Sequence, residues 1–285
     1  MPTRPGPTVQ RRRLGIELRR LRETAGKTID EVAQVLECSD SKVSRIENGQ
    51  VSASPRDVRD MLEFYGVDSE RRDALVEVTR SARQKGWWQA YSDAPVMPLV
   101  GLEVVADQIH AYEAMAVPGL LQTRDYARAM ISALRPGLPD DQIDRWVDLR
   151  MIRQELLARE TPPLFLAILE ECVLRRPVGG HLVMLAQLEH LVMSAAMPSL
   201  TLQVLPLSVG VHSAMYGAFA VYRFAEPTDP DVVYFEQDIS DLYLENPEQV
   251  AWYDAAFERL RSAALNPEDS LHFLEDLIRN MEQLS

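Results

Sequence analysis

The chain has 285 residues, of which 46% are hydrophobic and 26% charged, and its formal net charge at pH 7 is −13. This length suits two domains, and the composition excludes extensive disorder. No apolar run is long enough to cross a bilayer, and no apolar stretch follows the charged N-terminus as a secretory signal would require. The two cysteines, Cys38 and Cys172, lie far apart in the sequence. We therefore expect a cytoplasmic protein without a disulfide framework.

The charge is divided unevenly between two parts of the chain. Residues 1–85 contain 17 Lys and Arg against 14 Asp and Glu, a net charge of +3, whereas residues 86–285 contain 13 against 29, a net charge of −16. Because an acidic surface repels polyanions, a contact with nucleic acid is expected in the first part. The alternative is that the basic run Arg11-Arg12-Arg13 is only a solvated arm.

The first part is predicted to form five helices. The first helix has apolar residues at the spacing of one helical face, and Gly26 ends it; they are Leu14, Leu18, Leu21 and Ala25. Thr28 and Glu31 form a capping-box pattern at the start of a helix over about 29–36. The fourth helix opens at Ser54-Pro55, and the fifth covers about 69–84.

The third helix is short and follows the turn Glu37-Cys38-Ser39. Ser39 is its expected N-cap and Gly49 its expected end. Val43 and Ile46 face inward, which leaves five polar or charged residues outside: Asp40, Ser41, Lys42, Ser44 and Arg45. Two short helices joined by a three-residue turn, the second with a polar and basic outer face, have the geometry that enters a DNA major groove.

Residues 12–66 resemble the helix-turn-helix of the phage-repressor or xenobiotic-response-element class, above all in TIDEVAQVLECSDSKVSRIENG. The resemblance implies a structural ion pair between Arg22 and Glu47. It also implies base contacts by Asp40, Ser41 and Arg45. The residues that it implies for the DNA backbone are Thr28, Ile29, Lys42, Ser44, Asn48, Gln50, Ser52, Ser54 and Arg56. Family members usually have Gly at the turn position of Glu37, which must adopt a left-handed conformation at a cost of roughly 1 kcal/mol or form another turn. The alternative is a helical bundle of the same shape that does not bind DNA.

The second part begins after a break in the pattern at 85–98, KGWWQAYSDAPVMP. We predict a linker in which Trp87 and Trp88 dock on the following domain. Beyond it, helices are predicted over 100–114, 123–134, 139–160, 178–196 and 267–284, and strands over 164–170, 199–207, 219–224 and 232–237. The predicted fold class is therefore mainly α, with a five-helix helix-turn-helix domain (10–84) followed by an α+β effector or partner-binding domain (99–285).

Several blocks of the second part carry a second resemblance: VPGLLQTRDYARAM at 117–130, the segment 153–180, and the later GAFAVYRF and VVYFE. They resemble a domain of unknown function that follows such helix-turn-helices in actinobacterial regulators. Its members resemble antitoxin-like transcriptional regulators and are often encoded beside a small partner protein. The resemblance thus implies a protein partner and carries no biochemical activity.

Polar residues in these blocks allow two interpretations. Arg150, Arg153 and the pair Glu170-Glu171 can form an internal ion-pair network, with Tyr126 in the core. Alternatively, an effector pocket is lined by Tyr126, Arg153, Glu170 and Arg175. No sequence motif indicates a nucleophile, a phosphate-binding loop or a metal site, so we expect no enzyme, no cofactor and no metal.

These patterns predict a sequence-specific DNA-binding transcriptional regulator. We expect a homodimer on an inverted-repeat operator of double-stranded DNA, with its recognition helices about 34 Å apart. The motive for a dimer is an apolar stripe on the last helix, formed by Leu271, Leu274, Ile278 and Met281. The signal is expected from a small partner protein. Two alternatives stay open: a regulator switched by a small-molecule ligand and, more remotely, an enzyme with an appended DNA-binding domain.

Overall fold

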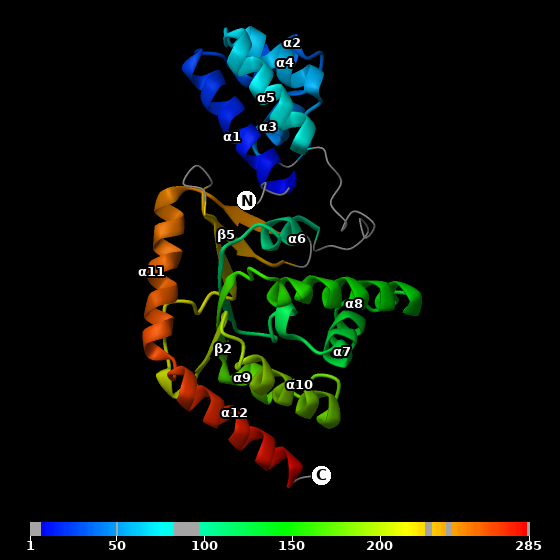
Figure 1. Cartoon of the computed structure of the whole chain (residues 1–285), viewed down its shortest axis with the longest axis vertical. Helices are drawn as coiled ribbons and strands as arrows, with labels where there is room; N and C mark the ends of the chain where they lie inside the picture. The colour runs from blue at the N-terminus through cyan, green and yellow to red at the C-terminus, as the bar shows by residue number, and fades with distance from the viewer. Residues whose placement is uncertain (1–6, 50, 83–96, 226–229, 238–240, 284–285) are drawn as a thin grey trace. The chain divides into compact units, whose positions relative to one another are not determined.

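The computed structural model describes residues 7–49, 51–82, 97–225, 230–237 and 241–283, which form two compact units, Met1–Val105 and Ala106–Ser285 (Figure 1). The predicted arrangement of a helix-turn-helix domain followed by an α+β domain is confirmed. The predicted docking of Trp87 and Trp88 lies outside the described residues. No helix among the described residues is long and apolar enough to cross a membrane.

The first unit contains the five predicted helices and one short further helix. Their bounds are α1 (Pro7–Thr24), α2 (Ile29–Val35), α3 (Asp40–Glu47), α4 (Pro55–Phe64), α5 (Ser69–Ala82) and α6 (Met97–Glu103). The five helices of the bundle share a core to which each contributes one apolar face; among its members are Leu18, Val32, Val43, Ile46, Val58, Met61 and Val76. The apolar residues that recur at helical spacing in the sequence are therefore the residues that are buried in the core.

Helix caps fix where α2 and α4 begin. The hydroxyl of Thr28 accepts a hydrogen bond from the N–H of Glu31, whose carboxylate accepts one from the N–H of Thr28, as the capping box requires. The hydroxyl of Ser54 caps α4 by accepting from the N–H of Asp57. Ser39 occupies the predicted N-cap position of α3, but its hydroxyl makes no capping hydrogen bond.

The second unit is built around a sheet of six strands in the described residues. The strands are β1 (Gln108–Glu113), β2 (Leu164–Glu170), β3 (Leu200–Leu205), β4 (Phe219–Arg223), β5 (Val232–Phe235) and β6 (Leu242–Leu244). The helices are α7 (Arg124–Leu134), α8 (Asp140–Gln154), α9 (Glu171–Arg175), α10 (His181–Ser194), α11 (Pro247–Ala263) and α12 (Pro267–Glu282), with 3₁₀ turns at Gly119–Leu121, Glu155–Ala158 and Leu207–Val209.

The strand order is β3-β2-β1-β4-β5-β6, and the sheet is mixed. β1, β2 and β3 are parallel, whereas β4, β5 and β6 pair antiparallel with their neighbours. The carboxyl ends of β1, β2 and β3 consequently meet at one edge of the sheet, together with the start of β4. Loops that follow these strands are brought together there, although they are distant in the sequence.

Helices cover both faces of the sheet (Figure 1). α11 lies on one face, where Phe257 and Leu260 pack with Tyr112 and Val221. α7, α8 and α10 lie on the other side. α12 packs against α10 and β3, and it buries Leu274 and Leu277 there, so part of the apolar stripe predicted for dimerisation is used within the chain.

The predicted helix over 100–114 is wrong for most of its length. α6 ends at Glu103, and Gln108–Glu113 is strand β1, which is hydrogen-bonded to β2 on one side and β4 on the other. Because β1 is covered on both faces, its residues from Ile109 to Tyr112 are all buried. A short apolar run of this kind does not distinguish a central strand from a buried helix. β6 and α11 were not predicted.

The segment 117–123 after β1, VPGLLQT, is held by side-chain hydrogen bonds to its backbone. The hydroxyl of Tyr126 accepts from the N–H of Val117, and Gln154 donates to the carbonyls of Gly119 and Gln122. The fully buried Gln187 of α10 accepts from the N–H of Thr123 and donates to the carbonyl of Leu121, both at 2.7 Å. The motif is therefore a folded connection whose polar backbone groups are paired.

Replacing Gln187 by Leu should destabilise the second unit. The substitution leaves the N–H of Thr123 and the carbonyl of Leu121 without a hydrogen-bond partner, which costs roughly 1–3 kcal/mol for each group. Urea unfolding of the full chain should show a lower midpoint. As a control, Gln142→Leu makes the same chemical change on the exposed face of α8 and should leave the midpoint within error. Equal midpoints for both variants would contradict this role of Gln187.

Candidate nucleic-acid interface

The turn between α2 and α3 contains a left-handed residue, which is the first of the two possibilities expected for Glu37. Glu37 has a φ of 50°, and it is the one non-glycine residue with positive φ in the described part of the chain. The N–H of Cys38 donates to the carbonyl of Ala33, which closes the end of α2. The turn usually made with Gly is thus made with Glu, at a cost of roughly 1 kcal/mol.

α3 has a buried face and an exposed face. Val43 and Ile46 are at most 2% exposed, and they pack into the core of the first unit. With only eight residues, α3 is too short to be stable alone, so its position depends on contacts with the other helices.

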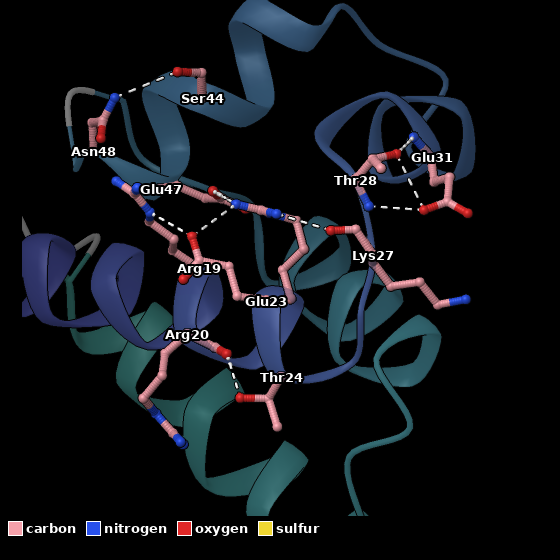
Figure 2. Close-up of polar contacts among 11 residues, drawn as sticks. Arg19, Arg20, Glu23, Thr24, Lys27, Thr28, Glu31, Ser44, Glu47 and Asn48 are labelled. Atoms are coloured by element: carbon pink, nitrogen blue, oxygen red, sulfur yellow. Dashed lines mark hydrogen bonds and ion pairs between the residues drawn. The ribbon is translucent and has the colours of Figure 1, made fainter.

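The strongest of these contacts is a buried ion pair with α1. The guanidinium of Arg22 donates to both carboxylate oxygens of Glu47, at 2.7 and 3.1 Å, and its third nitrogen donates to the carbonyl of Lys27. Both side chains are buried, and the hydrogen bond to Glu47 raises the pKa of Arg22. Figure 2 shows these contacts as dashed lines that end at Glu47 and at the carbonyl of Lys27, with the capping box of Thr28 and Glu31 next to Lys27. The structural pair implied by the resemblance is therefore present.

Gly15 brings α1 and the end of α3 into direct backbone contact. A Cβ at this position would lie 2.6 Å from the carbonyl oxygen of Glu47 and 2.7 Å from that of Ile46. Since real Cβ atoms do not approach so closely, any other residue would push the two helices apart. Gly15 and the Arg22–Glu47 pair thus fix α3 from the same helix.

The three residues predicted to contact bases all lie on the outside of α3. Asp40, Ser41 and Arg45 are exposed. The Nε of Arg45 donates to the carbonyl of Ser41 at 3.1 Å, which leaves the terminal nitrogens of the guanidinium for a bidentate contact such as the one that arginine makes with guanine.

The residues predicted to contact the DNA backbone are distributed around this face. Ser52 and Arg56 are exposed, and Asn48 donates to the hydroxyl of Ser44. Thr28 and Ser54 are occupied as N-caps, and Ile29 packs against the core, so these three would reach phosphates through their backbone or not at all. Gln50 lies outside the described residues.

Lys42 is held by a partner that the sequence did not reveal. Its ammonium forms an ion pair with Asp57 of α4 at 3.1 Å. Burial opposes ionisation of Asp57, but the hydrogen bonds from Lys42 and Ser54 outweigh it and lower the pKa of this carboxyl group. A phosphate that contacts Lys42 must compete with Asp57. The two residues are fifteen positions apart, a spacing that has no local signal.

Three of the four residues of the predicted effector pocket, Tyr126, Glu170 and Arg175, are bound to different partners. Glu170 accepts hydrogen bonds from Tyr112 and His212, whereas Arg175 is paired with Glu171. Within the described residues no hydrogen bond or ion pair joins any two of the four: Tyr126, Arg153, Glu170 and Arg175. These contacts give the predicted pocket no support, and it stays a prediction.

One perturbed carboxyl group in this unit was missed. Burial, and then the neighbouring carboxylate of Glu236, raise the pKa of Glu113 to about 8, although Arg150 opposes the shift. Glu113 is the last residue of β1. Because the sequence predicted a helix there, it did not indicate that Glu113 lies at an edge of the sheet. In the described part of the chain, no group of three or more His, Cys, Asp or Glu is arranged to hold a metal ion.

The α2–turn–α3 arrangement, with its polar outer face and buried ion pair, defines a helix-turn-helix. Comparison with protein families agrees: the family described as a helix-turn-helix domain matches residues 13–75, which supports a DNA-binding regulator. The family described as a domain of unknown function (DUF5753) matches residues 96–276, and because this is more than half of the chain, the protein belongs to that family. Both resemblances read from the sequence are confirmed. Neither the curated proteins nor the solved structures include a match.

Replacing Arg22 by Ala should destabilise the first unit by about 3–5 kcal/mol, because it leaves the carboxylate of Glu47 buried without its partner. Thermal unfolding of the full chain should show a lower midpoint for the transition of this unit. Arg20→Ala is the matched control on the same helix, since it removes an exposed pair with Glu17 and should have a much smaller effect. An unchanged midpoint for Arg22→Ala would contradict the structural role of the pair.

Replacing Asp57 by Asn should strengthen DNA binding. The substitution releases Lys42 to contact a phosphate, so the slope of log K against log salt should steepen by about 1. The control is Glu63→Gln, which removes an exposed carboxylate from the same helix without touching Lys42. Titration of labelled duplexes at several salt concentrations measures both quantities. If the two variants gave the same slope, competition between Asp57 and DNA would be excluded.

Proposed function

We propose that the protein is a sequence-specific DNA-binding transcriptional regulator that acts by binding rather than by catalysis. The observation that carries the proposal is the outer face of α3, where Asp40, Ser41 and Arg45 are exposed on a helix that the buried Arg22–Glu47 pair holds in place. Fixed side chains on a short helix are what direct readout of base edges requires.

The charge distribution supports a division of roles between the two parts. The net charge of residues 1–85 is +3, and that of residues 86–285 is −16. The acidic part disfavours non-specific association with polyanions, so attraction to DNA is confined to the first part. Affinity then depends on the few contacts that α3 and its neighbours make.

We further propose that the regulator is a homodimer on an inverted-repeat operator. One short helix contacts few base pairs, whereas two copies related by a two-fold axis read two half-sites. The second unit is proposed to receive a signal from a small partner protein, in the manner of an antitoxin-like regulator. The resemblance of its sequence blocks to such regulators supports this part of the proposal.

Selection of bound fragments from randomised duplexes tests the proposed function. The full-length protein should enrich an inverted repeat. Arg45→Ala should lose preference at one base pair in each half-site, a discrimination of about 1–3 kcal/mol. Lys42→Gln is the control on the same helix: because Asp57 holds Lys42, this substitution should leave the sequence preference unchanged. A folded protein that enriches no sequence, or an Arg45→Ala variant with unchanged preference, would refute the proposal.

A further inference from the structure

Exposed apolar side chains gather at one edge of the sheet in the second unit. Met115 follows β1 and is 62% exposed, and four more lie in the loop between β3 and β4: Leu207 (58%), Val211 (88%), Met215 (59%) and Tyr216 (105%). We call these five residues the apolar rim. Both loops lie at the edge where the carboxyl ends of β1, β2 and β3 meet. Single exposed apolar residues are ordinary on a protein surface, but a group of this kind marks a contact site.

Hydrogen bonds link the two loops of the rim through α9. The thiol of Cys172 donates to the carbonyl of Ala114, next to Met115. The carboxylate of the preceding residue, Glu171, accepts from the N–H of Leu207. Both loops of the rim are therefore bound to the start of α9.

The long loop of the rim is fixed by polar contacts of its intervening residues. Nδ1 of His212 accepts from the N–H of Ala214, so Nε2 carries the proton that is donated to Glu170 at 2.9 Å. The hydroxyl of Ser213 donates to the carbonyl of Ala256 on α11. The polar side chains of His212 and Ser213 thus bind to the protein, whereas the apolar residues that flank them, Val211, Met215 and Tyr216, are exposed. A loop fixed in this way loses little conformational entropy when its apolar residues are covered.

The loop that supplies four of the five rim residues has no charged residue, although the second part of the chain is strongly acidic. The thirty-two residues from 191 to 222 contain no Asp, Glu, Lys or Arg, although 26% of the whole chain is charged. Depletion of charged residues is typical of the core of a protein interface. This depletion of charge matters most when both partners carry charge of the same sign. That is the case in a two-fold dimer, where each patch contacts the same patch of the second copy. A partner of opposite charge would not require it.

We propose that the apolar rim is the surface through which two copies of this chain pair about a two-fold axis. The inference rests on the homodimer of the proposed function and locates its interface. The five side chains at these exposures offer a contact of the order of the roughly 800 Å² per partner that a standard interface buries. α12, the element first expected to mediate pairing, has Leu274 and Leu277 buried within its own chain.

Sedimentation of the full-length protein over a range of concentrations tests the proposal. Tyr216→Asp replaces the most exposed side chain of the rim by a carboxylate that the pair would bury, and it should weaken dimerisation by at least about tenfold, as expected for loss of an aromatic anchor. The control is Leu182→Asp, which introduces the same charge at a 76% exposed residue of α10 and should leave dimerisation unchanged. Circular dichroism should show both variants folded.

The outcomes separate this inference from the proposed function. Dimers of equal strength for the wild type and Tyr216→Asp would overturn the interface but leave the regulator dimeric. The interface would also be overturned if Tyr216→Asp stayed dimeric but lost a co-purifying protein that Leu182→Asp retains. The rim would then bind a different protein and not a second copy of this chain. A wild-type monomer that still selects a single half-site would overturn pairing without removing DNA recognition. Absence of any sequence preference would instead refute the DNA-binding function.

Discussion

The position of α3 depends on one interaction, the buried ion pair between Arg22 and Glu47. An eight-residue helix with an exposed polar face has little stability of its own, and its two inward apolar residues allow it to rotate or slide. The pair removes this freedom because a bidentate contact has a defined direction as well as a distance. Gly15 also sets the distance between α1 and α3, because the backbones of the two helices are in contact at this residue. DNA recognition by Arg45 and Ser41 is possible only on a helix that is fixed in this manner.

Local signals made most of the first unit predictable. The capping box, the proline at the start of α4 and the helical period each act within a few residues, so they are visible without a structure. The second unit was less predictable because its sheet joins distant segments. β1 is covered on both faces and lacks the alternation of a half-exposed strand. The contacts of Lys42 with Asp57 and of Gln187 with the segment after β1 join residues that are far apart in the sequence, and no periodic pattern reports them.

The two units use charge in opposite ways. The first unit carries the basic excess of the chain. One of its basic groups, Lys42, is paired with the carboxylate of Asp57, which limits DNA affinity that does not depend on sequence. The second unit carries the acidic excess of the chain, but its loop with four of the five rim residues has no charged residue. In the proposed dimer, repulsion between two acidic chains would be weakest where these uncharged apolar loops meet. Both features weaken non-specific association and so leave a larger share of the binding free energy to specific contacts. A regulator that must find its site in a genome requires this selectivity.

Methylation interference on a selected operator tests most directly whether the outer face of α3 enters the major groove. Methylation at guanine N7 changes only the major-groove edge, which is the edge that arginine reads. The structure predicts that methylation of one guanine in each half-site blocks binding of the wild-type protein and has no effect on the residual binding of Arg45→Ala. Interference confined to adenine N3 in the minor groove, or identical patterns for the two proteins, would contradict the assignment of α3 as the recognition helix.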